Sequence, residues 1–258
     1  MVILGVLDYN ICNIANALRA LEYIATPKYK IKRVTTIEDI GQCDKLIIPG
    51  VGAFKSAMDN FVANGLDHAI IEFASSGKYL LGICLGMQLL FDRSYEFGIH
   101  NGLGLIEGDI VHFGNSASNN VASSLGDISN ISLYNSANVF VSTNVKIDSS
   151  DMKSNEYLCQ DSSVGLGKYL GEKIPHIGWN QNFITKQHRL LYGLDDGFYL
   201  YFVHSYCASC EIKYIIARCE YICSFPSVVC KDNILGVQPH PERSHKDGLK
   251  ILSNFLLL

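Results

Sequence analysis

The first 91 residues alternate short apolar runs with segments whose apolar residues recur at helical spacing. Residues 2–7 form a β-prone run, and apolar residues at helical spacing follow over residues 14–24. The same order recurs after residues 46–48 and after residues 79–83, where the second helical stretch extends through Phe91. This alternation predicts parallel strands joined by right-handed helical crossovers, with the strands in one sheet.

The second half of the chain has a different pattern. Residues 198–206, 213–217 and 234–238 are typical of strands separated by short loops, and residues 244–258 are typical of a helix that packs on the sheet. We therefore expect an α/β fold with an open, mixed, largely parallel sheet that is flanked by helices.

Length and composition favour one domain over residues 1–258. With 258 residues, of which 48% are apolar, the chain can bury one substantial core. Residues 115–163 are dominated by serine, asparagine and aspartate. We interpret them as a polar insertion that contains a hairpin or a mobile excursion, because such a composition buries little apolar area against its ordering entropy.

The net charge, the N-terminal run and the number of cysteines indicate which partners and which cellular compartment to expect. A formal net charge of −4 supplies no basic field for nucleic acid. The apolar N-terminal run has only strand length, so we expect neither a signal peptide nor a membrane span and predict a cytoplasmic protein. Nine cysteines, an odd number, indicate reduced thiols rather than a disulfide framework.

Four of these cysteines lie close together along the chain. Cys207 and Cys210 form a CxxC pair, and Cys219 and Cys223 follow, which superficially resembles a four-thiolate zinc site. The alternative is that the thiols are small apolar side chains in and between strands. We favour the second interpretation and expect no metal and no cofactor.

The sharpest local signal is the segment Gly82-Ile83-Cys84-Leu85-Gly86, which lies between a predicted strand and a predicted helix. Such a turn holds its central residue in a strained conformation and exposes its side chain, while the glycines let neighbouring backbone pass. The helix N-terminus favours a thiolate there. Cys84 is therefore the candidate nucleophile, the alternative being a buried cysteine in a glycine-rich turn.

A second signal is His240-Pro241-Glu242, directly after the predicted strand over residues 234–238. Residues two apart in an extended segment face the same side, so His240 and Glu242 can point into one site. Glu242 can fix the tautomer of His240, whose other nitrogen exchanges protons with Cys84. A lone His-Pro-Glu would more often be a surface turn.

A third signal is Pro49-Gly50-Val51-Gly52, which follows a predicted strand at the sheet edge where α/β proteins bind ligands. The backbone amides of Val51 and Gly52, together with that of Leu85, are candidates for stabilising an oxyanion when Cys84 attacks a carboxamide. An ordinary strand-to-helix loop is the alternative.

Taken together, these blocks resemble the class I, triad-type glutamine amidotransferase family, and within it the glutaminase subunits of imidazole glycerol phosphate synthases. The resemblance covers the whole chain except the insertion. The matching blocks are Ile48–Phe54, Gly82–Phe91, Pro175–Asn180, Tyr201–Tyr206 and Gly236–Glu242. It implies a flavodoxin-like α/β fold and a glutaminase that forms a γ-glutamyl thioester on Cys84 and releases glutamate and ammonia.

The resemblance also implies binding surfaces and a partner. L-glutamine would be held near Gly52, Gln88, Ser205 and Tyr206. A heterodimer with a (β/α)₈-barrel cyclase would use Asn13, Trp179, Asn180 and Tyr201 beside an ammonia exit. In the family, the cyclase combines the ammonia with a phosphoribulosyl ribonucleotide intermediate, which yields imidazole glycerol phosphate for histidine biosynthesis.

The chain departs from the family pattern outside the proposed triad. The family's Asp-Tyr-Gly-x-Gly-Asn turn has Asn10 and Cys12 here in place of its two glycines. Pro239 replaces the aromatic residue that precedes His-Pro-Glu in the family, and Arg243 replaces the lysine that follows it. An alternative is therefore a paralogous glutaminase that supplies ammonia to a synthase that aminates or amidinates a surface sugar.

Two further alternatives come from other classes. A cysteine peptidase or chaperone-like relative would reuse the exposed thiol and ignore glutamine. A regulatory subunit with a decayed site would have lost a triad member, whereas Cys84, His240 and Glu242 are all present.

Overall fold

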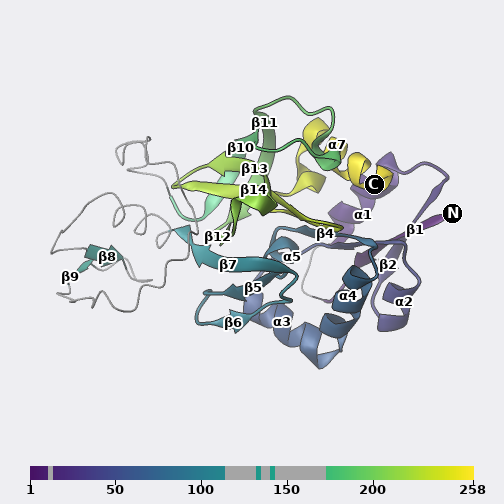
Figure 1. The fold of residues 1–258 in the computed structure, drawn as a ribbon, viewed down its shortest axis with the longest axis horizontal. Helices are drawn as coiled ribbons and strands as arrows, with labels where there is room; N and C mark the ends of the chain where they lie inside the picture. The colour runs from purple at the N-terminus through teal and green to yellow at the C-terminus, as the bar shows by residue number, and fades with distance from the viewer. Residues whose placement is uncertain (11–13, 114–131, 135–139, 143–172) are drawn as a thin grey trace.

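The computed structural model describes residues 1–10, 14–113, 132–134, 140–142 and 173–258 (Figure 1). Within these residues, nine strands form one sheet in the order β11-β10-β13-β14-β15-β4-β3-β1-β2. The parallel half pairs β2 with β1, β1 with β3, β3 with β4 and β4 with β15. These strands are β1 (Val2–Leu7), β2 (Tyr29–Val34), β3 (Lys45–Ile48), β4 (Tyr79–Ile83) and β15 (Ile234–Val237).

The other half of this sheet is antiparallel. It continues from β15 through β14, β13 and β10 to β11, so the sheet is mixed. The bounds are β10 (His176–Ile184), β11 (Phe198–His204), β13 (Ile215–Glu220) and β14 (Ser224–Lys231).

Helices cover both faces of the parallel half (Figure 1). One face is covered by α1 (Ile14–Ile24) and α7 (His245–Leu257), and the other by α2 (Ile37–Gly41), α3 (Phe54–Ala63) and α4 (Leu66–Ser75). Side chains alternate along β3, so Ile47 packs in the α1–α7 core while Leu46 and Ile48 pack in the core under α2–α4. Parallel strands buried on both faces explain the continuous apolar runs of the sequence.

A smaller sheet lies beside the large one. Its order is β12-β7-β5-β6, with β5 (Phe91–Ser94), β6 (His100–Asn101), β7 (Ile106–His112) and β12 (Tyr206–Ser209). Within the proposed insertion, β8 (Ser132–Tyr134) and β9 (Phe140–Ser142) pair as an antiparallel hairpin. The rest of residues 115–163 lies outside the described residues, so the one-domain division remains an expectation.

The predicted α/β class with a mixed sheet is confirmed. The strands over residues 2–7 and 79–83 have the predicted bounds, whereas the predicted strand over residues 198–206 divides into β11 and β12, which belong to different sheets. The helix after Cys84 was predicted too long: α5 covers only Leu85–Gln88, and Phe91 begins β5. A short apolar run does not distinguish a buried helix from a strand, and here the smaller sheet takes the run. Lys213 and Tyr214 belong to a 3₁₀ turn, η3 (Ile212–Tyr214), ahead of β13.

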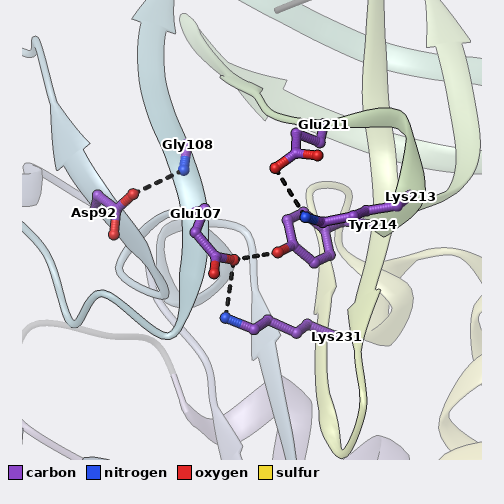
Figure 2. Close-up of polar contacts among 7 residues, drawn as sticks. All are labelled: Asp92, Glu107, Gly108, Glu211, Lys213, Tyr214 and Lys231. Carbon is purple, nitrogen blue, oxygen red and sulfur yellow. Dashed lines mark hydrogen bonds and ion pairs between the residues drawn. The ribbon is translucent and has the colours of Figure 1, made fainter.

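A polar cluster ties the two sheets together (Figure 2). Glu107 on β7 accepts hydrogen bonds from the Tyr214 hydroxyl and from Lys231 Nζ, the latter at 2.8 Å. These two hydrogen bonds, led by that from Lys231, lower the pKa of Glu107 to about 2. The carboxylate thus connects β7 of the small sheet to β14 of the large one.

No helix in the described part of the chain is long and apolar enough to cross a membrane.

We predict that Glu107→Gln destabilises the fold at neutral pH by about 0.5–1 kcal/mol, a range that allows for solvent screening of a half-exposed group. Since the folded-state pKa of Glu107 is about 2 and its usual value is 4.5, the stabilisation is present above pH 4.5 and is lost as the pH falls toward 2. Urea denaturation of both proteins at pH 7 and pH 3 measures this. The difference between them should shrink at pH 3.

The matched control is Glu211→Gln, which removes a neighbouring ion pair to Lys213 that is exposed (Figure 2). That variant should retain the stability of the wild type at both pH values. A destabilisation of Glu107→Gln that is equal at pH 7 and pH 3 would contradict the assigned role of the carboxylate.

Candidate active site

Cys84 lies on a strained turn at the carboxyl end of β4. Its φ of 53° and ψ of −110° are unusual for a residue with a side chain. The flanking glycines are required by space, because a Cβ on Gly86 would lie 1.8 Å from the Ile48 carbonyl oxygen and one on Gly82 would lie 2.5 Å from the Gly86 oxygen. The predicted nucleophile elbow is therefore present in its backbone geometry.

Parallel pairing of β4 with β15 brings the two distant motifs together. Ile83 is opposite Val237, and the Cys84 amide donates to the Val237 carbonyl at 2.8 Å. The chain then continues past Gln238 to His240, whose amide donates to the Tyr201 carbonyl of β11 at 2.8 Å. Cys84 and His240 thus lie at the same edge of the sheet, and both are nearly buried, with 6% and 3% of their surfaces exposed.

His240 and Glu242 lie within hydrogen-bonding distance of each other, as expected from their spacing. His240 Nδ1 lies 2.8 Å from Glu242 Oε1, at the 3₁₀ turn η4 (Pro241–Arg243). Burial alone would lower the pKa of His240, but the electrostatic interaction with Cys84, followed by the hydrogen bond to Glu242, raises it to about 10. His240 Nε2 makes no hydrogen bond of ordinary geometry to the described residues, and Cys84 acts on it mainly as a nearby charge. The raised pKa favours a protonated imidazole beside Cys84.

The Gly50–Val51 peptide has its carbonyl directed at the elbow. The Leu85 amide donates to the Gly50 oxygen at 3.3 Å. In a planar trans peptide the carbonyl and the following N–H point in opposite directions, so the Val51 N–H points away from Leu85. Gly52 has a φ of 106°, which is accessible to glycine. The three backbone amides proposed for the oxyanion site, those of Val51, Gly52 and Leu85, therefore lie close together. In this conformation, however, the Leu85 amide is hydrogen-bonded to the Gly50 carbonyl.

The residues implied in glutamine binding are only partly brought together. Gln88 Nε2 donates to the Tyr206 carbonyl and to Gln238 Oε1, both at 3.1 Å. Ser205 lies between β11 and β12, where its carbonyl accepts from the Phe113 amide at 3.2 Å. Gly52 lies in the loop between β3 and α3.

The residues implied at the partner surface lie on β10 and β11 and do not all face the same side. Trp179 is opposite Tyr201 on β11, with ring centroids 6.0 Å apart, and it is 45% exposed. Trp179 also stacks on His245 at 5.0 Å. Asn180 faces the opposite side, since successive strand residues alternate, and its Nδ2 donates to the Glu220 carbonyl at 2.9 Å. Asn13 lies outside the described residues.

Sequence reasoning missed Gln238, a buried side chain within hydrogen-bonding range of the thiol. Gln238 is fully buried, and its Nε2 lies 3.7 Å from Cys84 Sγ. It is the residue before Pro239 and His240, so its position followed from the strand end, but its direction depends on contacts with Gln88. Buried His176 and His204 were also missed, because their pairing joins two antiparallel strands.

The departures from the family pattern have local explanations in two cases. Asn10 has a φ of 66°, and asparagine is among the few residues that tolerate the conformation of the glycine that it replaces. Its amide donates to Asp8 Oδ1 at 3.1 Å. Arg243 lies over the Tyr201 ring, 4.7 Å from its centroid, so it is part of the Trp179–Tyr201 surface.

The described residues contain no group of three or more histidine, cysteine, aspartate or glutamate side chains that could hold a metal ion. Cys207, Cys210, Cys219 and Cys223 are buried, and burial raises the pKa of the Cys219 thiol.

In this structure, a cysteine on a strand-to-helix elbow lies beside a buried histidine–carboxylate pair at the carboxyl edge of the parallel strands. This arrangement is typical of α/β enzymes that use a thiol nucleophile. The chain belongs to the class-I glutamine amidotransferase family, whose pattern matches residues 5–258, and within it to the imidazole glycerol phosphate synthase subunit HisH family.

Two relatives support the narrower assignment. Imidazole glycerol phosphate synthase subunit HisH of Sulfurimonas denitrificans is 42% identical over 98% of this chain and 96% of its own length. The same subunit of Wolinella succinogenes is 38% identical over 97% of both chains.

A solved structure supports the fold. PurLQS from Thermotoga maritima aligns with 99% of this chain and 98% of that chain, at a TM-score of 0.60 and 15% sequence identity.

We predict that removing either negative charge lowers the pKa of His240 from its value of about 10. Cys84→Ala should lower it more than Glu242→Gln, because the charge of Cys84 is the larger of the two raising effects. NMR titration of the His240 ring protons measures both shifts. A His240 pKa that is unchanged in Cys84→Ala would show that the thiol and imidazole do not form a charge pair.

Proposed function

We propose that this chain is the glutaminase subunit of an imidazole glycerol phosphate synthase, which hydrolyses L-glutamine and passes ammonia to a cyclase. The observation that carries the proposal is the meeting of Cys84 with the His240–Glu242 pair at one sheet edge, together with relatives named HisH along nearly the whole chain.

The proposed reaction runs through a thioester. The Cys84 thiolate attacks the carboxamide carbon of glutamine, and the tetrahedral intermediate collapses as protonated His240 donates its proton to the leaving nitrogen. Ammonia departs and a γ-glutamyl thioester remains on Cys84. Neutral His240 then takes a proton from water, which attacks the thioester and releases glutamate and the thiolate. Glu242 holds Nδ1 of His240 and so directs Nε2 at the reacting atoms.

The oxyanion site is proposed to form by rotation of the Gly50–Val51 peptide. In the present conformation the Gly50 carbonyl accepts from Leu85 and would repel an oxyanion. Rotation would release the Leu85 amide and direct the Val51 amide inward, which gives the two donors that acyl transfer requires. Gly52 supports the movement, since its positive φ is accessible without a side chain.

The proposed partner is a (β/α)₈-barrel cyclase that forms a heterodimer with this chain. The surface formed by exposed Trp179 and half-buried Tyr201 is the proposed docking site, because aromatic side chains are enriched at interfaces. We propose that glutamine contacts Gly52, Gln88, Ser205 and Tyr206, and that the complex is cytoplasmic.

The alternative partner is a synthase that aminates or amidinates a surface sugar. The observation that favours it is that Arg243, which replaces the family lysine, covers Tyr201 on the proposed docking surface. Complementation of a histidine auxotroph that lacks its own glutaminase subunit separates the two partners. Growth without histidine supports the cyclase, and no growth despite measured glutaminase activity supports the alternative.

We predict that Cys84→Ala lowers glutamine-dependent turnover of the complex by about 10⁴-fold or more. Turnover with free ammonium as the nitrogen source should stay at the wild-type rate, because that route bypasses the thiol. Parallel assays with glutamine and with ammonium salts measure both. Glutamine-dependent turnover that survives the substitution would remove Cys84 from the mechanism.

We predict slow glutamine hydrolysis by the isolated chain and faster hydrolysis when the partner binds its acceptor ligand. The physical reason is that the Leu85 amide is occupied by Gly50 O until the peptide rotates. Glutamate release is measured for the chain alone, with the partner, and with the liganded partner. Equal rates in all three would exclude the peptide rotation as the controlling step.

A further inference from the structure

Gln238 is the buried polar side chain that faces the nucleophile from the neighbouring strand. Its Nε2 lies 3.7 Å from Cys84 Sγ, within hydrogen-bonding range for sulfur, and none of its surface is exposed. A primary amide can present either its oxygen or its NH₂ group to a neighbour. Which of these faces the sulfur decides whether Gln238 stabilises or opposes a thiolate.

The orientation of Gln238 is determined by a second amide. Gln88 Nε2 lies 3.1 Å from Gln238 Oε1 and 3.1 Å from the Tyr206 carbonyl. The backbone carbonyl only accepts, so the NH₂ group of Gln88 must face it, and the second proton of that group then meets Gln238 Oε1. The NH₂ group of Gln238 is left to face Cys84.

The Tyr206 carbonyl is itself held by a chain of two histidines. It accepts from His204 Nδ1 at 2.8 Å, which leaves His204 Nε2 as an acceptor for His176 Nδ1 at 3.2 Å. His176 Nε2 then accepts from Asn180 Nδ2 at 3.3 Å. The side-chain amide of Asn180 is oriented because its Oδ1 accepts a hydrogen bond from the backbone N–H of Gln181 at 2.7 Å. One set of proton positions satisfies the whole chain.

Both histidines are neutral links of this chain. Burial lowers the pKa of His176 to about 4 and that of His204 to about 3. His176 is also clamped between the rings of Phe202 and Tyr221, at centroid distances of 4.6 and 4.0 Å. Because both rings are neutral and held in place, they fix the direction of each hydrogen bond from Asn180 to the Tyr206 carbonyl and add no charge near the thiol.

We propose that Gln238 is a further catalytic residue that donates a hydrogen bond to the Cys84 thiolate, and that Gln88, His204, His176 and Asn180 are positioning residues that hold its amide in the donating orientation. The inference deepens the proposed function, since it rests on Cys84 as the nucleophile. It also connects the thiol to β10, the strand that carries Trp179 and the proposed docking surface.

The test measures the reactivity of Cys84 directly in the full-length chain. Alkylation by iodoacetamide is followed from pH 5 to 9, and the peptide that contains Cys84 is quantified by mass spectrometry. Gln238→Met keeps the volume and removes the donor. We expect its Cys84 alkylation at pH 7 to be about tenfold slower, as for loss of one hydrogen bond to a charged group, with the half-maximal pH moved upward.

Two further variants separate positioning from a general structural effect. His176→Phe retains the ring stack but removes both nitrogens, and it should slow alkylation by a smaller factor. Gln181→Met makes the same side-chain change next to Asn180 and keeps the backbone amide that donates to Asn180 Oδ1, so it should behave as the wild type. Far-ultraviolet circular dichroism and melting curves establish that each variant is folded.

A folded Gln238→Met variant with the wild-type alkylation rate and half-maximal pH would overturn the proposal. If that variant does not fold, Gln238→Leu also removes the donor without adding a titratable group, so alkylation at pH 7 must fall, and an unchanged rate overturns the proposal equally. The alkylation assay needs neither glutamine nor partner. Its outcome is therefore independent of whether the proposed glutaminase function holds.

Discussion

One backbone hydrogen bond fixes the geometry on which the site depends: the Cys84 amide donates to the Val237 carbonyl where β4 and β15 end side by side. This bond continues the parallel ladder into the elbow. It therefore places Cys84 beside Gln238, two residues before His240. Cys84 and His240 are 156 positions apart along the sequence. The glycines at 82 and 86 allow that approach, because side chains there would collide with backbone.

Around this bond, most buried polar side chains of the site have hydrogen-bond partners, and a few polar atoms do not. The amides and histidines between Cys84 and Asn180 find partners, as buried polar groups must if they are to stabilise rather than destabilise a fold. Two of the buried atoms that lack a hydrogen-bond partner among the described residues are His240 Nε2 and Glu242 Oε2. The first of these, His240 Nε2, is the atom proposed to transfer protons. The Gly50–Val51 peptide supplies the movable part of the same site.

The sequence predicted the features that depend on local pattern, and it failed where direction depends on distant contacts. The elbow, the His-Pro-Glu pair and the parallel crossovers follow from spacing that one strand or helix imposes. The run after Gln88 was assigned to a helix because apolar residues suit either state, and its pairing with residues at 106–110 decided for β5. Asn180 was grouped with Trp179, although strand alternation turns adjacent side chains to opposite faces. Gln238 was missed because its amide is oriented by Gln88, which is held in turn by the Tyr206 carbonyl.

The central claim is that Cys84 reacts with the side-chain carbon of glutamine while His240 and Glu242 lie behind it. A glutamine analogue with an electrophilic diazoketone in place of the carboxamide tests this most directly, in the complex with the liganded cyclase. Peptide mass spectrometry should find one covalent adduct per chain, on Cys84, and excess L-glutamine should prevent its formation. Labelling spread over several cysteines, or labelling of Cys84 that L-glutamine does not slow, would contradict the account.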